Sequence, residues 1–224
     1  MSKITITGSE GLIGKKITNF FSKNHSVNKL DFKLGHDLSD EKFVKNWFKK
    51  NKSDYLINCF AINDHVEKQR KTHTLFDFPL SAFTDYMKVN VISLFSVCRE
   101  FARNNKKGSI VNFSSTYGIV SPRPDLYDGS HKDVAYSVSK ASVINLTKYL
   151  AVHLAPNIRV NCVAPSGVKA NQNTDFIKKY SDLIPLKRMM KSNELNGILD
   201  FLCSDKSSYV TGSTFVIDGG YTSW

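Results

Sequence analysis

The chain has 224 residues and a formal net charge of +11, and 41% of its residues are hydrophobic. This length suits one large α/β domain with a sizeable core, and no apolar run is long enough to span a bilayer. The lysines are scattered through predicted helices, and no nucleic-acid-binding motif is present. We therefore expect a solvated basic surface, with neither a nucleic-acid nor a membrane partner.

The N-terminal sequence and the cysteines indicate a cellular compartment. The first residues, MSKITITGSEG, lack the basic and apolar segments of a secretory signal. Four cysteines lie far apart, with no CxxC pair and no histidine at metal-ligand spacing: Cys59, Cys98, Cys162 and Cys203. We expect free thiols in a reducing cytoplasm and no metal site.

Strand-like runs alternate with helix-period segments, which is typical of a parallel sheet covered on both faces. The predicted strands lie at 3–7, 26–31, 55–60, 109–115, 158–165 and 213–218. The predicted helices lie near 12–23, 39–51, 81–104, 133–155 and 193–204, and Ser39 or Asp40 is expected to cap the second. The pattern predicts one doubly wound, Rossmann-type α/β domain over residues 1–224.

The connection after the second predicted strand is short. Only FKLGH separates Asp31 from Asp37. A crossover between parallel strands needs about a dozen residues, so these five cannot supply another helix and strand. We therefore predict six parallel strands, with the strand that ends at Asp31 on the sheet edge.

The turn TGSEGLIG follows the first predicted strand and opens the first helix. Glycines in such a turn let a pyrophosphate approach backbone N–H groups at the positive end of the helix. A simple strand-to-helix turn is the alternative. The predicted cofactor contacts here are Gly8, Glu10, Gly11, Leu12, Ile13 and Gly14.

Asp31 ends the second predicted strand, where a carboxylate can accept hydrogen bonds from both ribose hydroxyls of the cofactor's adenosine. It would repel a 2′-phosphate, and Glu10 adds a second negative charge nearby. No arginine follows Asp31, because the next residue is Phe32. This combination favours NAD over NADP, although a solvated acid at a strand end is a common alternative.

Tyr136 and Lys140 lie four residues apart in a predicted helix, so both side chains share one face. Chance places such pairs in many helices, and two half-exposed neighbours are the ordinary interpretation. The functional interpretation is that the ammonium stabilises the phenolate and lowers the pKa of the tyrosine toward neutrality. Such a tyrosine could exchange a proton with an alcohol or carbonyl oxygen.

Eight motifs occur in the order and spacing of one enzyme family: TGSEGLIG, HDLSD, NCFA, MKVN, IVNFSS, AYSVSK, RVNCVAPSGV and YVTGSTFVIDGG. Through nearly its whole length the chain resembles the short-chain dehydrogenase/reductase family. Within that family it is most similar to reductases of bacterial surface-sugar and flagellin-modification gene clusters, on the stretches SPRPDLYDG and KDVAYSVSKASVINLTKYLAVHLAP.

The resemblance implies an NAD(P)-dependent oxidoreductase that interconverts a secondary alcohol and a ketone. Tyr136 matches the general acid/base, and Lys140 matches the lysine that lowers its pKa and binds the nicotinamide ribose. Ser115 matches the hydroxyl that bonds the substrate oxygen, and Asn90 the asparagine that holds a proton-relay water. Further cofactor contacts implied by the resemblance are Asp37, Leu38, Asn58, Ala61, Pro165, Gly167 and Val168.

The chain departs from the family pattern at several positions. NCFA stands for the usual NNAG, PSG for PG, and Ala170 for a threonine that contacts the cofactor. The glycine spacing is closer to that of the epimerase-like branch. A nucleotide-sugar epimerase or dehydratase therefore remains an alternative, as does a non-catalytic NAD(P)-binding sensor.

Two segments are candidates for substrate recognition. The polar, basic segment 169–187 is expected to form a mobile lid. The twenty residues between Ser115 and Tyr136 exceed the family's usual length, and Arg123 and Tyr127 are the predicted substrate contacts there. A surface loop or a contact with a partner subunit is the alternative. We expect a carbohydrate-like substrate, and a homodimer or homotetramer that pairs the helices near 81–104 and 133–155.

Overall fold

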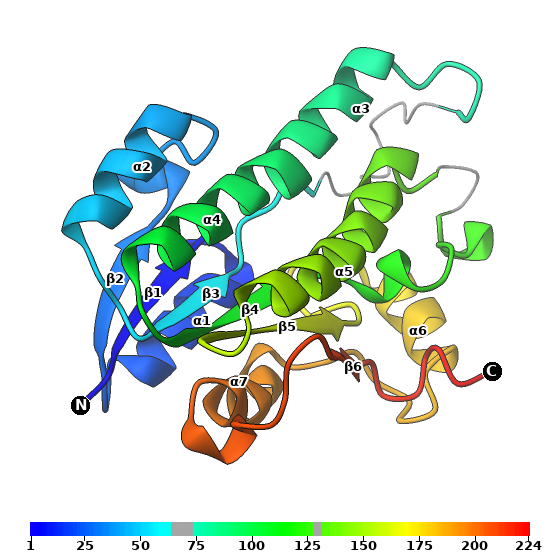
Figure 1. Ribbon diagram of the computed structural model, residues 1–224. Coiled ribbons are helices and arrows are strands. Elements are labelled where there is room, and N and C mark those ends of the chain that lie inside the picture. Colours follow the sequence, from blue (N-terminus) through cyan, green and yellow to red (C-terminus); the bar gives the residue numbers. More distant parts are fainter. Residues whose placement is uncertain (64–73, 128–130) are drawn as a thin grey trace.

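The computed structural model describes residues 1–63, 74–127 and 131–224, and its centre is one parallel β-sheet (Figure 1). The 6-stranded sheet has the spatial order β2-β1-β3-β4-β5-β6, and every neighbouring pair is parallel. The strands are β1 (Lys3–Thr7), β2 (Ser26–Leu30), β3 (Tyr55–Asn58), β4 (Gly108–Phe113), β5 (Ile158–Pro165) and β6 (Thr214–Ile217). The prediction of six parallel strands with β2 at the edge is confirmed for the described part of the chain.

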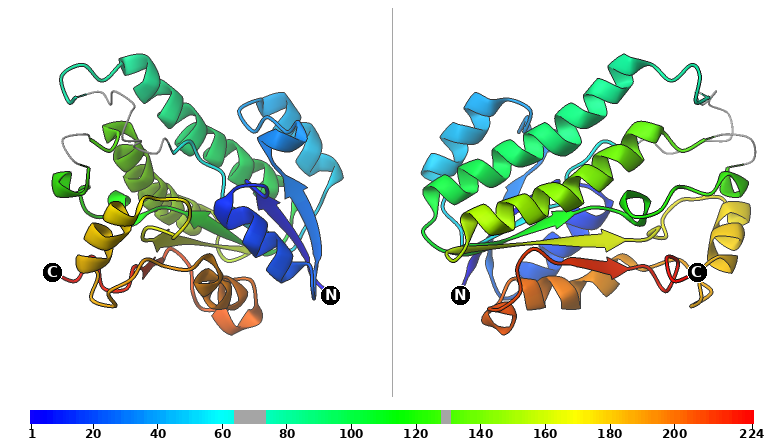
Figure 2. Two further views of the ribbon diagram at one scale, coloured as in Figure 1. Left: turned by 180° about the vertical axis from the view of Figure 1, so that it is seen from behind. Right: turned by 45° about the vertical axis from the view of Figure 1, so that its right-hand side comes forward.

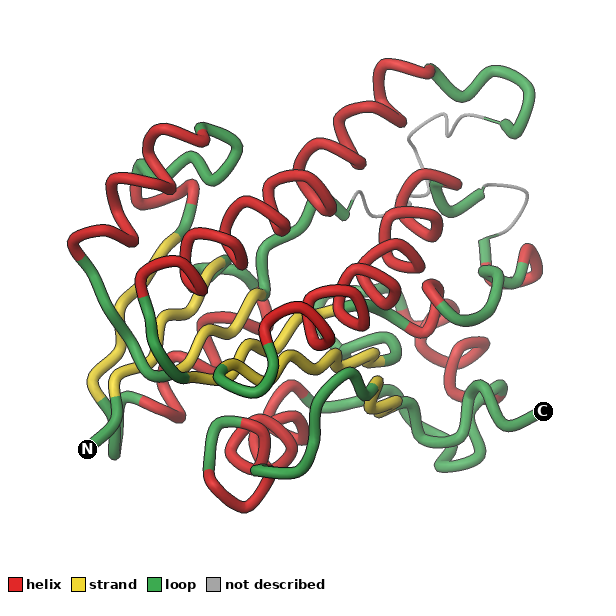
Figure 3. Tube along the Cα trace, in the orientation of Figure 1, coloured by secondary structure: helices red, strands yellow, loops and turns green. Residues whose placement is uncertain are grey.

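Helices cover both faces of the sheet (Figures 1 and 2). On one face lie α2 (Glu41–Lys50), α4 (Leu94–Asn104) and α5 (Val134–Leu154); on the other lie α1 (Leu12–Phe21) and α7 (Asn196–Leu202). A π-helical turn, Lys88–Ser93, joins α3 (Leu80–Met87) to α4, and Figure 3 shows this long rod beside α5. The doubly wound α/β prediction is therefore confirmed.

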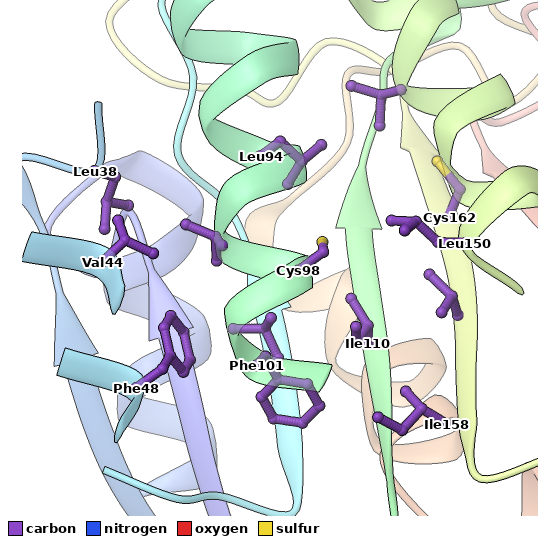
Figure 4. Packing of buried hydrophobic residues seen from close by; sticks show 14 of the residues in the cluster. Leu38, Val44, Phe48, Leu94, Cys98, Phe101, Ile110, Leu150, Ile158 and Cys162 are labelled. Atoms are coloured by element: carbon purple, nitrogen blue, oxygen red, sulfur yellow. The ribbon is translucent and has the colours of Figure 1, made fainter. Parts of the chain in front are cut away.

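The two faces bury separate apolar clusters, because successive residues of a strand point to opposite sides. Ile110 lies with Phe101 in the cluster under α2, α4 and α5 (Figure 4). Leu56 of β3 belongs to the same cluster. The next residue on each strand, Ile57 and Val111, packs under α1 and α7. Because β3 and β4 are buried on both faces, apolar residues occupy consecutive positions in YLIN and SIVNF.

The connection after β2 explains why this strand lies at the edge. Asp31 caps a single 3₁₀ turn, Phe32–Leu34, and Gly35 then adopts a φ of 80°. This left-handed conformation is one that glycine adopts readily. The chain turns back at once toward α2, whose N-cap is Asp40: its Oδ1 accepts the N–H groups of Lys42 (2.8 Å) and Phe43 (3.2 Å).

The segment 169–187 contains a helix that the pattern did not predict, α6 (Thr174–Asp182). Asn173 caps it by accepting the N–H of Phe176 (2.8 Å), and Phe176 stacks on Tyr180 one turn later. Both signals were present in the sequence and were missed within a polar stretch. The ends of the other predicted helices and strands agree with those in the structure to within a few residues. No helix in the described ranges combines the length and apolar character needed to cross a membrane.

Candidate active site

The predicted site residues gather at the carboxyl ends of the strands. The turn after β1, the loop after β3, Ser115 after β4 and Pro165 at the end of β5 all lie along this edge of the sheet. The first turns of α5 bring Tyr136 and Lys140 to the same edge. Ligands of open α/β sheets bind at this edge.

Tyr136 and Lys140 are both buried. The Nζ of Lys140 donates to the carbonyl oxygen of Phe113 (2.9 Å) and lies 5.8 Å from the centroid of the Tyr136 ring. The Ser114 hydroxyl donates to the Lys140 carbonyl oxygen (2.7 Å), which fixes α5 against the end of β4. The two side chains therefore form one buried pair and are not two exposed neighbours.

The pKa values of this pair differ from the prediction. Burial raises the pKa of Tyr136, and a hydrogen bond with the Ser115 side chain opposes that rise. Burial also lowers the pKa of Lys140, to about 8. Desolvation disfavours the charged form of each group, and the Lys140 ammonium is directed to the Phe113 carbonyl. The protein alone therefore does not lower the pKa of Tyr136 toward neutrality.

Ser115 and Asn90 lie near the pair but have different environments. The Ser115 hydroxyl accepts the N–H of Tyr117 (3.2 Å) at the start of a 3₁₀ turn. Asn90 lies in the π-helical turn, a feature that is frequent at functional sites. Its Oδ1 accepts the Ile62 N–H (2.8 Å), and its Nδ2 donates to the Ile62 carbonyl (3.1 Å) and Ser139 Oγ (3.0 Å). Asn90 thus joins the loop after β3 to α5.

The turn after β1 fits a pyrophosphate. A Cβ on Gly8 would meet the backbone nitrogen of Phe60 at 2.5 Å, and one on Gly14 would meet the Gly8 oxygen at 2.0 Å, so packing excludes side chains there. At Gly11, a Cβ would meet only the Gly8 oxygen, at 3.2 Å. Among the described residues, no side chain caps α1, and the buried hydroxyl of Ser9 has no partner. The first N–H groups of α1, from Leu12 onward, are thus available to an anion.

Asp31 organises the adenosine side of the site. Its Oδ2 accepts the Glu10 N–H (2.9 Å) and its Oδ1 accepts the Lys33 N–H (2.8 Å). The carboxylate is buried but keeps lone pairs for further donors. The Glu10 carboxylate lies 3.6 Å from the Nζ of Lys29, so its negative charge is partly compensated.

The other predicted adenine-side residues differ in accessibility. Asp37 is at the surface, and hydrogen bonds from Ser39 lower the pKa of its carboxyl group. Leu38 lies in the apolar cluster under α2. Asn58 is buried in a chain of polar contacts, with Thr7 Oγ1 donating to its Oδ1 (2.9 Å) and its Nδ2 donating to Asn112 Oδ1 (2.9 Å). Its side chain is therefore committed to the protein interior.

Ala61 lies in the same loop as Asn58. It is exposed, three residues beyond the end of β3. Because the Asn58 side chain faces inward, Asn58 can contact a ligand at the sheet edge only through its backbone.

The segment after β5 is held by a residue that the sequence interpretation missed. Beyond Pro165, the N–H of Gly167 donates to the hydroxyl of Tyr180 on α6 (2.8 Å). A Cβ on Gly167 would meet the Tyr180 ring at 2.9 Å. Val168 pairs with Met190 in an isolated parallel bridge. Tyr180 and Gly167 therefore fit one another, and no motif could have paired them because they come from separate elements.

The two predicted substrate residues lie in the long segment before α5, of which residues 128–130 are outside the described part. Arg123 pairs with Asp125 (3.2 Å) at the surface. The hydroxyl of Tyr127 hydrogen-bonds that of Tyr117 (2.8 Å), and its ring centroid lies 6.0 Å from that of Phe176 on α6. Tyr127 is thus part of an aromatic cluster, whereas Arg123 projects outward.

Known proteins share this sequence and this arrangement. A family model described as enoyl-(acyl carrier protein) reductase matches residues 15–222. The post-translational flagellin modification protein A of Campylobacter coli is 30% identical over 249 residues, with 97% of each chain covered. The chain belongs to the short-chain dehydrogenase/reductase family.

Two other members are similar to this short-chain dehydrogenase/reductase. The D-arabinitol 2-dehydrogenase of Candida tropicalis is 35% identical over 163 residues, which cover 66% of this chain and 55% of the relative. The crystal structure of a short-chain dehydrogenase from Leptospira borgpetersenii serovar Hardjo-bovis with bound NAD+ is 33% identical, with a TM-score of 0.88, and the match covers 99% of this chain and 92% of that one. The protein is therefore an oxidoreductase that acts on alcohol and ketone groups with NAD(P).

Proposed function

We propose that this short-chain dehydrogenase/reductase uses Tyr136 as its general acid/base and Lys140 and Ser115 as supporting groups. The observation that carries this proposal is the buried cluster of these three side chains at the carboxyl edge of the sheet. In ketone reduction Tyr136 gives its proton to the substrate oxygen, and in alcohol oxidation it takes the proton back. Acid–base help of this kind is typically worth about 10²–10⁴-fold in rate.

The residues around the acid/base have separate tasks in this mechanism. NAD(H), when bound, supplies or accepts the hydride. Gly11 and the free N–H groups at the start of α1 would hold the pyrophosphate, and Asp31 the adenosine ribose. The Lys140 ammonium, beside the phenol, would stabilise negative charge on Tyr136 and donate to the nicotinamide ribose. The Ser115 hydroxyl would donate to the substrate oxygen and fix its position.

We propose NAD as the preferred cofactor. A 2′-phosphate placed at the end of β2 would meet the buried Asp31 carboxylate, whose two oxygens already define the turn by accepting the N–H groups of Glu10 and Lys33. Like charges at such short range, partly shielded from water, are unfavourable. The pairing of Glu10 with Lys29 makes Asp31 the main determinant in this proposal.

The proposed substrate is a sugar or sugar-derived alcohol or ketone. One relative is a flagellin modification protein and another is a sugar-alcohol dehydrogenase. The segment next to the site supplies the Arg123 guanidinium and the Tyr127 hydroxyl and ring, a set suited to a polar, hydroxylated ligand.

We also propose that each chain forms a single domain. We propose further that the chains assemble into a homo-oligomer and that this oligomer is located in the cytoplasm. Exposed apolar side chains gather on the π-helical turn, α4 and α5: Ile92, Phe95, Val138, Tyr149 and Val152. Burying such a face against a second copy would remove it from water. Analytical ultracentrifugation would measure the state.

The test is a screen of keto-sugars and sugar alcohols, free and nucleotide-linked, with NAD(H) and NADP(H). A net change in nicotinamide absorbance with at least one compound is expected, with NADH binding more tightly than NADPH in fluorescence titration. Product formation without a net absorbance change would instead indicate an epimerase or dehydratase. Tight cofactor binding with no turnover of any compound would indicate a sensor.

A further inference from the structure

A second lysine lies against the proposed acid/base. The Nζ of Lys132 is 4.6 Å from the centroid of the Tyr136 ring, and the Nζ of Lys140 is 5.8 Å from the same centroid. Both distances are within the range of about 6 Å over which a cation interacts with an aromatic ring. The ring of one buried tyrosine is therefore approached by two ammonium groups.

We infer that Lys132 is a positioning residue that fixes the Tyr136 ring and favours the ionised form of its phenol. This inference rests on the proposed role of Tyr136 as the acid/base. It assigns a function to the end of the long segment before α5 that is separate from substrate recognition.

Contacts of Lys132 and of its neighbour Asp133 define the position of the ammonium group. Its Nζ donates to Asn63 Oδ1 (2.6 Å), in the loop after β3. Its neighbour Asp133, the N-cap residue of α5, accepts a hydrogen bond from the Tyr86 hydroxyl on α3 (2.9 Å). The Tyr86 ring packs edge-on against Tyr136 with a centroid separation of 6.4 Å. The ammonium is thus held at its Nζ by Asn63, and the chain that follows it is held through Asp133.

Every element packed around Tyr136 brings titratable or polar groups, and few of them are charged. Among the described residues, the Asp133 carboxylate precedes α5 and accepts a hydrogen bond from the Tyr86 hydroxyl. Within the described ranges, the other groups that face the phenol or Lys140 are Tyr86, Ser115, Tyr117, Tyr127, Tyr180, Cys59 and Cys162. Of the described groups placed around the ring, Lys132 and Lys140 carry the positive charge.

The two lysines differ in what holds them. The Lys140 ammonium is almost fully buried and donates to the Phe113 carbonyl, so that oxygen partly compensates its positive charge. Lys132 is only partly buried, and its Nζ lies closer to the centroid of the Tyr136 ring than the Nζ of Lys140 does. A cation over the face of an aromatic ring, here 4.6 Å from its centroid, stabilises negative charge on that ring system. Lys132 therefore offsets some of the burial that disfavours ionisation of Tyr136.

The sign of the effect follows from which form of Tyr136 is active. Alcohol oxidation needs the phenolate, so its rate rises with pH and levels off above the pKa of Tyr136. Removing a cation raises that pKa and moves the midpoint to higher pH. We expect an upward shift of about one pH unit, which corresponds to about a tenfold loss of phenolate below the midpoint.

The experiment is the pH profile of kcat for alcohol oxidation in Lys132→Met, Lys132→Arg and Lys148→Met, with NADH affinity and melting temperature measured in parallel. Lys132→Met keeps the apolar stem and removes the charge, and Lys132→Arg restores the charge. Lys148 is an exposed lysine on α5, the helix that begins two residues after Lys132, and serves as the matched control. Should Lys132→Met not fold, Lys132→Gln replaces it.

The expected result is an upward shift of the midpoint in Lys132→Met, recovery in Lys132→Arg and no change in Lys148→Met, with NADH affinity unaltered. An unchanged midpoint in Lys132→Met would overturn the inference. So would a shift that Lys132→Arg fails to reverse, since a structural role is not restored by charge. The variant Tyr136→Phe separates the two proposals. If Tyr136→Phe remains active, the proposed function fails. If Tyr136→Phe is inactive and the midpoint of Lys132→Met equals that of the parent, only the inference about Lys132 fails.

Discussion

The cofactor side and the substrate side of this site are built in opposite ways. The turn after β1 is shaped by backbone atoms: the Cβ position of Gly8 lies 2.5 Å from the Phe60 nitrogen, and that of Gly14 lies 2.0 Å from the Gly8 oxygen. The substrate side is shaped by rings, with Tyr180 stacked between Phe176 (5.6 Å) and Tyr221 (5.5 Å). Backbone packing tolerates one residue type, whereas a ring cluster can be assembled from many sequences.

The two sides also differ in where their residues come from. The cofactor turn is one continuous stretch of eight letters, TGSEGLIG. The aromatic cluster draws on the segment after β4, on α6 and on the C-terminal tail, through Tyr117, Tyr180 and Tyr221. A local motif therefore predicts the first side, and only the folded chain brings the second together.

The largest effect is expected on the cofactor side, in the variant Gly8→Ala. Gly8 has a φ of 66°, and its Cβ would overlap the Phe60 backbone, which cannot move without displacing β3. We expect a loss of about 3 kcal/mol or more in the free energy of unfolding, or failure to fold. Urea unfolding followed by circular dichroism measures it.

Gly11→Ala is the matched control in the same turn. Gly11 has a φ of −75°, and its Cβ would meet only one oxygen, at 3.2 Å. Stability should change by no more than about 1 kcal/mol, while NADH affinity falls at least about tenfold because the methyl group occupies the approach of the pyrophosphate. Equal losses of stability in Gly8→Ala and Gly11→Ala would contradict the claim that Gly8 is required by packing and Gly11 by cofactor binding.

A smaller loss is expected where backbone and ring meet, in Gly167→Ala. The new Cβ would press on the Tyr180 ring at 2.9 Å and on the end of Met189 at 3.0 Å, and these side chains can shift partly. We expect a loss of about 1–3 kcal/mol in the free energy of unfolding, measured by thermal unfolding. Gly197→Ala in α7 is the control: its Cβ has nothing within 4 Å, so it should stabilise the protein by about 0.5–1 kcal/mol.

The sequence predicted the parts of this protein that depend on local pattern. Six parallel strands followed from the alternation of apolar runs and from the five residues FKLGH, because chain length limits a crossover regardless of side chains. The π-helical turn around Asn90 was not predicted because it continues the helical pattern of its neighbours, and α6 was not predicted because it lies within a polar stretch.

Side-chain environments were harder to predict than positions. Asn58 falls on a family motif, but its amide is used between β1 and β4, through Thr7 and Asn112. The Tyr136–Lys140 pair lies where the motif places it. The raised pKa of Tyr136 depends on burial by residues from separate parts of the chain, such as Tyr86 and Tyr117, which a spacing of four residues does not encode.

The smallest expected effects are at the exposed part of the substrate side, in the segment before α5. Arg123→Ala and Tyr127→Phe should each raise KM for the true substrate a few-fold, with NAD affinity unchanged, because they remove polar contacts without touching the reacting atoms. Steady-state kinetics with the substrate found by screening measures this. Unaltered kinetics in both would assign specificity to the segment 169–187 and leave 116–134 as a surface or subunit contact.

The central claim is that Tyr136 transfers the proton, and Tyr136→Phe tests it most directly. The change removes one oxygen from a buried ring that packs against Tyr86, so the fold and the NADH affinity should be retained. The account predicts that kcat falls by about 10²-fold or more in both directions of the reaction. A kcat within a few-fold of the parent, with the fold and NADH affinity intact, would contradict it.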